Sequence, residues 1–167
     1  MKLVRYGEKG AEKPGLIDKS GQLRGLSAHV ADLNGDAYTP ETLKKLAALD
    51  PDSLPAVSGK PRLGAPVTGI SKFVAIGLNY SDHAKETGMP IPAEPIIFLK
   101  ANTSLCGPSD AIEKPRGSTK LDWEVEIAAI IGTRAKYVSE DDALNHVAGY
   151  CICNDVSERN FQTERLG

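Results

Sequence analysis

The stretch LDWEVEIAAII at residues 121–131 decides our prediction of the fold. Successive side chains of a β-strand point to opposite faces, so Glu124 and Glu126 share one face while the apolar residues around them share the other. The second half of the stretch carries no charge, which indicates a strand that runs into a hydrophobic core. We therefore predict a strand-rich α+β fold with an acidic pair at the entrance to this strand.

A third carboxylate stands at the end of a second predicted strand. This strand covers residues 148–155 and ends at Asp155, where a rigid element holds a side chain that still reaches solvent. Three carboxylates from two strands suit Mg²⁺, Mn²⁺ or Ca²⁺, which prefer oxygen ligands. We interpret Glu124, Glu126 and Asp155 as a candidate metal site, and a solvated strand face with alternating charge as the alternative. Two further acids are interpreted as loop or surface residues: Asp110 and Asp122.

The segment NYSDHAKE at residues 79–86 carries a different chemistry. His83 and Glu86 are three residues apart, so on a helix they lie on one face within hydrogen-bond reach. A histidine that a carboxylate orients and makes more basic is a suitable general base. The alternative is an exposed ion pair with no catalytic role.

The rest of the chain divides near residue 65. Residues 1–65 predict a small N-terminal α+β module and linker, with a first strand, a β-hairpin around residues 18–21 and a helix that Thr39 caps. Four prolines between residues 50 and 66 predict an extended crossing segment. Residues 66–167 predict a second domain of strands with short helices. Its remaining expected elements are the strands 72–76, 95–99 and 123–131 and the helices 82–87 and 140–146.

Composition excludes several classes of function. Twenty basic residues against 22 acidic ones give a net charge of −2, whereas a protein that binds nucleic acid or a membrane surface typically shows a basic excess. No apolar run approaches the ~20 residues that span a bilayer, and no signal peptide is visible at the N-terminus. Three cysteines do not suggest a disulfide framework. We expect a cytoplasmic protein.

Several of these segments, taken in order, resemble the fumarylacetoacetate hydrolase superfamily. The resemblance covers roughly residues 73–162 and implies a mixed β-roll catalytic domain behind a small N-terminal module, in a homodimer. In that family the catalytic domain normally continues well beyond the position of Gly167, so we expect a truncated chain that holds only the N-terminal part of this domain. The segments that carry the resemblance are IGLNYSDH at 76–83, PIIFLK at 95–100, DWEVE at 122–126 and NDVSERNFQ at 154–162.

The resemblance also implies roles for individual residues. It makes Glu124, Glu126 and Asp155 the ligands of Mg²⁺ or Mn²⁺, with Ca²⁺ as a substitute in crystals, and makes His83 and Glu86 a catalytic dyad. One departure is Leu78, because many short members carry arginine there. The positions that match substrate-binding residues are Tyr80, Lys100, Arg159 and Gln162.

The function that follows is hydrolysis of a carbon–carbon bond in a 2,4-dioxo acid, an acylpyruvate or a diketo sugar acid. The substrate would be a small 2-oxo acid, with no nucleic-acid or membrane partner. Two alternatives stay open. The same metal site also serves a ureidoglycolate lyase, a 2-oxo acid decarboxylase or an isomerase, and a truncated chain could be a metal-binding fragment without turnover.

Overall fold

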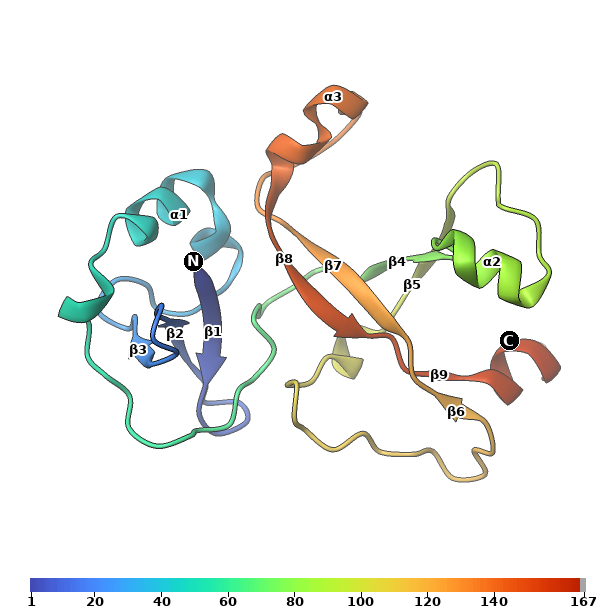
Figure 1. Cartoon of the computed structure of the whole chain (residues 1–167), viewed down its shortest axis with the longest axis horizontal. Helices are drawn as coiled ribbons and strands as arrows, with labels where there is room; N and C mark the ends of the chain where they lie inside the picture. The colour runs from blue at the N-terminus through green and yellow to red at the C-terminus, as the bar shows by residue number, and fades with distance from the viewer. Residues whose placement is uncertain (166–167) are drawn as a thin grey trace. The chain divides into compact units, whose positions relative to one another are not determined.

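The computed structural model describes residues 1–165, and Figure 1 shows its helices and strands. The fold is α+β and rich in strands, as the sequence predicts. In the described range, no helix is long and apolar enough to cross a membrane. The strands are β1 (Lys2–Tyr6), β2 (Lys13–Ile17), β3 (Leu23–Gly25), β4 (Val74–Gly77), β5 (Ile96–Leu99), β6 (Leu121–Asp122), β7 (Val125–Ile131), β8 (Val147–Asn154) and β9 (Ser157–Glu158). The α-helices are α1 (Pro40–Ala47), α2 (Ser81–Thr87) and α3 (Glu140–Ala143).

The chain forms two compact units. The first contains Met1–Thr68 together with the chain from Gly107 onward, and the second contains Gly69–Cys106. The first unit therefore joins the predicted N-terminal module to four strands of the predicted catalytic domain, β6 to β9. The predicted boundary near residue 65 stays a prediction.

The N-terminal part of the first unit has its own core. Strands β1, β2 and β3 form an antiparallel sheet in that order, and β2 and β3 flank the turn that the sequence predicts at residues 18–21. The hydroxyl of Thr39 accepts a hydrogen bond from the Thr42 amide and caps α1, and Pro40 takes the first helical position. The sheet and α1 enclose a cluster of buried leucines: Leu16, Leu26, Leu46 and Leu54.

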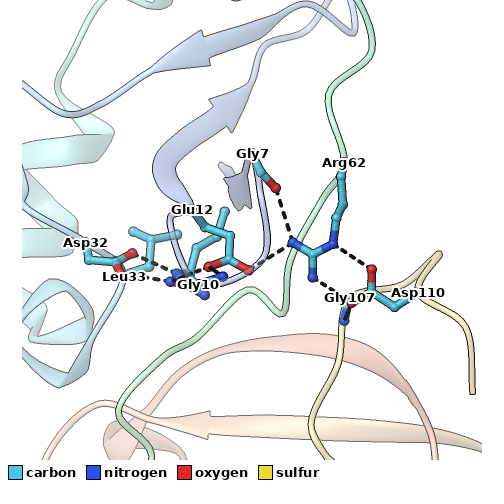
Figure 2. Close-up of polar contacts among 9 residues, drawn as sticks. Gly7, Gly10, Glu12, Asp32, Leu33, Arg62, Gly107 and Asp110 are labelled. Carbon is cyan, nitrogen blue, oxygen red and sulfur yellow. Dashed lines mark hydrogen bonds and ion pairs between the residues drawn. The ribbon is translucent and has the colours of Figure 1, made fainter. Parts of the chain in front are cut away.

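A network of charges joins the N-terminal part to the segment that enters β6 (Figure 2). Arg5 donates to Asp32, from Nε to Oδ1 at 2.7 Å and from Nη2 to Oδ2 at 2.9 Å. Arg62 donates through Nη1 to Glu12 at 2.9 Å, and through Nε and Nη2 to the two oxygens of Asp110, both at 2.6 Å. Five side chains from distant parts of the sequence thus satisfy one another.

The network changes the pKa of its acids. The Arg62 guanidinium, with the Gly107 amide, lowers the pKa of Asp110 to about 2. The hydrogen bond from Arg62 also lowers the pKa of Glu12, and the one from Arg5 lowers the pKa of Asp32. Asp110 lies in a loop, as the sequence predicts, but its side chain is an internal partner of Arg62, which the sequence does not indicate.

The second unit is an antiparallel hairpin, β4 with β5, and the short helix α2 that follows β4. The predicted helix is confirmed, and Gly88 ends it in the left-handed conformation with φ 66°. Its N-cap is Tyr80, which makes no side-chain capping bond. The apolar side chains of β5 are exposed along its whole length.

The first unit also contains the β7–β8 hairpin, whose antiparallel register runs from Val125 opposite Asn154 to Ile131 opposite Val147. One end of this hairpin packs on the N-terminal part, because Ile130 and Ala148 contact the buried cluster around Tyr38. Gly132 follows β7 at this junction, where a Cβ atom would stand 2.3 Å from the Tyr38 carbonyl oxygen. Only glycine allows so close an approach.

Candidate functional site

The predicted strand 123–131 is interrupted where its acidic pair begins. Residues 121–122 pair with β9, and pairing with β8 starts only at Val125. Between the two ladders the Glu124 amide donates to the Asn154 side-chain oxygen at 3.1 Å, and the Asp155 amide donates to the Glu124 carbonyl at 2.9 Å. A side chain thus replaces a backbone partner at this point. The interruption places Glu124 and Asp155 directly across from one another.

The alternation of side chains along β7 follows the prediction. Glu124 and Glu126 are half-buried, whereas the intervening residues are exposed: Trp123, Val125 and Ile127. Glu126 pairs with Cys153 on β8. Asp155 follows the end of β8, two residues after Cys153. Burial raises the pKa of Cys151, two residues before Cys153 on the same face. The backbone therefore directs three carboxylates to one half-buried face of the hairpin.

Arg159 lies against this face and binds three side chains. Its Nε donates to Asp122 at 3.0 Å, its Nη1 donates to the Gln162 side-chain oxygen at 2.9 Å, and its Nη2 forms an ion pair with Glu124. Burial alone would lower the pKa of Arg159, but Asp122 and Glu124 together raise it. Arg159 is fixed by its backbone as well, since its amide donates to the Lys120 carbonyl at 2.9 Å.

Asp122 is the residue of this site that sequence reasoning missed. It was interpreted as a loop or surface acid, and it is exposed, yet its carboxylate binds Arg159. Antiparallel pairing of β6 with β9 brings residues 122 and 157 side by side, which sets Arg159 close by. A sequence signal existed in the alternation, because Asp122, Glu124 and Glu126 stand at every second position.

The chemistry of Glu124, Glu126 and Asp155 and the positions of their backbones fit a divalent cation that binds oxygen ligands. Carboxylates are the side chains that Mg²⁺, Mn²⁺ and Ca²⁺ prefer, and three of them share one face. Within residues 1–165, however, no three Asp, Glu, His or Cys side chains gather into a cluster that could hold a metal ion. One of the three carboxylates, that of Glu124, forms an ion pair with Arg159 instead.

The other predicted site residues belong to the second unit. His83 and Glu86 both lie on α2, where His83 is half-buried and Glu86 is exposed. No hydrogen bond or ion pair joins their side chains in the described part of the chain, so the predicted dyad shares a helix without a direct contact. Tyr80 and Lys100 lie at the start of α2 and just after β5. Leu78 has a φ of 50°, a strained backbone conformation for a leucine of the kind that gathers at functional sites.

Comparison with known proteins settles the family. Residues 72–166 match the family described as "Fumarylacetoacetate (FAA) hydrolase C-terminal". The chain belongs to the fumarylacetoacetate hydrolase family. A protein of Burkholderia ambifaria, provisionally named a hydrolase, is 58% identical over 167 residues, which are the whole of this chain and 59% of that protein. The chain thus spans about three fifths of the length of such relatives.

Solved structures of this family share the fold over the whole chain. A fumarylacetoacetate hydrolase from Exiguobacterium antarcticum is 31% identical with a TM-score of 0.79, covering 99% of this chain and 59% of the other. A 5-carboxymethyl-2-hydroxymuconate delta-isomerase from Mycobacterium smegmatis is 26% identical with a TM-score of 0.70, covering 100% of this chain and 59% of the other. Family members on this fold therefore carry names from more than one reaction class.

Proposed function

We propose that this protein is a divalent-metal-dependent enzyme that hydrolyses a carbon–carbon bond in a 2,4-dioxo acid. The observation that supports it best is the register of the β7–β8 hairpin, which puts the backbone positions of Glu124, Glu126 and Asp155 at one end of the hairpin. These three carboxylates would hold Mg²⁺ or Mn²⁺, which when bound supplies Lewis-acid polarisation of the 2-oxo acid end of the substrate.

The protein's own side chains take the remaining roles. His83 accepts a proton from water at a ring nitrogen, and Glu86 lies one turn further along the same helix. The Gln162 side-chain oxygen accepts from Arg159, so its amide nitrogen is the end that donates to the substrate carboxylate. Tyr80 and Lys100 supply further polar contacts to the substrate.

The reaction balances without any other reactant. Water adds its oxygen to the carbonyl remote from the carboxylate and gives a proton to His83. The carbon–carbon bond then breaks, and its electron pair leaves with the 2-oxo acid fragment, which takes the proton back. The products are a carboxylic acid and a pyruvate-like 2-oxo acid.

Substitution of His83 tests this proposal. We expect His83→Ala to lower turnover of an acylpyruvate by roughly 10²–10⁴-fold, the usual contribution of a general base, and Glu86→Gln to cause a smaller loss. Metal affinity should stay nearly unchanged in both variants, because neither residue is a proposed ligand. If His83→Ala instead lost the metal, the assignment of His83 as the base would be withdrawn.

A second candidate is an isomerase or a decarboxylase that uses the same metal site. The name of the M. smegmatis structure supports the isomerase, and neither reaction requires an attacking water. Turnover of an acylpyruvate, oxaloacetate, ureidoglycolate and an unsaturated oxo-dioate, each with Mg²⁺ and after chelation, separates the candidates. Retention of most decarboxylation or isomerisation by His83→Ala would favour this second candidate. No turnover of any of them would leave a metal-binding protein without catalysis.

A further inference from the structure

The side chain of Arg159 has an unusual set of partners for a substrate-binding arginine. Three of its nitrogens are already engaged by Asp122, Gln162 and Glu124, all in the same unit of the protein. Its side chain is only 26% exposed. A guanidinium with two carboxylates and an amide oxygen around it has little capacity left for a substrate anion.

The ion pair places the permanent positive charge of Arg159 beside Glu124, which is a proposed metal ligand. Arginine does not lose its proton in proteins, so the charge is present at every physiological pH. A divalent cation that binds Glu124 meets this charge at contact distance and competes with it for the same carboxylate. The half-buried setting of Glu124, with 22% of its side chain exposed, weakens screening by solvent.

We propose that Arg159 is a positioning residue that limits the divalent-cation affinity of the Glu124 site. This inference rests on the proposed function, because it takes Glu124 as a metal ligand. Asp122 also takes part: its carboxylate accepts a hydrogen bond from Nε of Arg159. The positive charge is thus shared between Asp122 and Glu124, which weakens the ion pair with Glu124.

Two substitutions should therefore shift cation affinity in opposite directions. Arg159→Met keeps most of the length of the side chain and removes the charge, and should raise the affinity for Mn²⁺ roughly fivefold, the size expected for one partly exposed ion pair. Asp122→Asn should lower the affinity for Mn²⁺, because of the two carboxylates that contact Arg159 only that of Glu124 then remains. Arg159→Lys keeps the charge without the fork geometry and should fall between the wild type and Arg159→Met.

Calorimetric titration of the full-length protein with Mn²⁺ tests these expectations, with Arg134→Met as the control. Arg134 is an exposed arginine shortly after β7, and its loss should leave the affinity unchanged. The double variant Asp122→Asn/Arg159→Met completes the cycle: the effect of Asp122→Asn should be smaller there than in the wild type, since it acts through Arg159. A merely structural role for Arg159 would not raise the affinity.

The outcomes separate this inference from the proposed function. If the wild type binds Mn²⁺ and Arg159→Met binds it equally or more weakly, the inference is overturned and the metal site stands. If the wild type and all variants bind no Mn²⁺, both are overturned. Should Arg159→Met fail to fold, Arg159→Lys and Asp122→Asn still decide the question, and affinities that do not move in the predicted directions contradict it.

Discussion

The N-terminal part of the chain, Met1–Thr68, and the β7–β8 hairpin are built on opposite principles. The first encloses leucines that are almost fully buried, such as Leu26 and Leu16, and satisfies its internal charges. The second leaves a row of apolar side chains exposed, with Ile152 81% exposed and Ile127 69% exposed, and carries carboxylates on its other, half-buried face. The first region carries the buried core, whereas the second carries the proposed metal ligands.

The largest difference in stability should appear when a buried side chain is shortened in one region and an exposed side chain in the other. Leu26→Ala should lower the free energy of unfolding by about 2–5 kcal/mol, the usual cost of a cavity at a fully buried leucine. Ile152→Ala in the same 167-residue chain should change it by less than about 0.5 kcal/mol. Urea denaturation followed by circular dichroism measures both, and equal losses would show that the two regions do not differ in this way.

A smaller effect should come from the charge network around Arg62. Its acids have lowered pKa values, so the stability they contribute is complete above their ordinary pKa values of 3.8 to 4.5 and is lost as the pH falls toward about 2. Arg62→Met removes the main cause of both shifts. We expect it to lower the urea midpoint at neutral pH and to flatten the decline of stability across this acidic window.

Lys45→Met is the matched control for that experiment. Lys45 also pairs with a carboxylate, that of Glu41, but both side chains are more than 70% exposed, and exposed pairs contribute little. Its profile of stability against pH should stay close to that of the wild type. An Arg62→Met profile as steep as the wild type would show that the network does not couple stability to pH.

Local sequence signals predicted much of this architecture. The Thr39 cap of α1, the hairpin turn at residues 18–21 and the helix at residues 82–87 each depend on near neighbours, and each is confirmed. The alternation of half-buried and exposed side chains from Trp123 to Ile127 is confirmed for the same reason, because the period of a strand is a local property.

Long-range pairings were beyond local signals. Nothing in the sequence near Arg62 indicates that its partner is Asp110, or that Asp122 binds Arg159, since these pairs form only after distant segments meet. The interruption at Glu124 also escaped prediction, because it depends on the side chain of Asn154 from another strand. The sequence thus indicates Glu124, Glu126, Asp155 and Arg159 as candidate site residues, but not that Arg159 pairs with Asp122 and Glu124.

The measurement that tests the central claim most directly is metal titration of single carboxylate variants of the full-length protein. Glu124→Ala, Glu126→Ala and Asp155→Ala should each abolish binding of Mg²⁺ or Mn²⁺, whereas Leu26→Ala, as long as it remains folded, should bind as the wild type does. Calorimetry reports this without reference to any substrate. Unchanged affinity in any two of the three carboxylate variants would contradict the assignment of the metal site to this face of the β7–β8 hairpin.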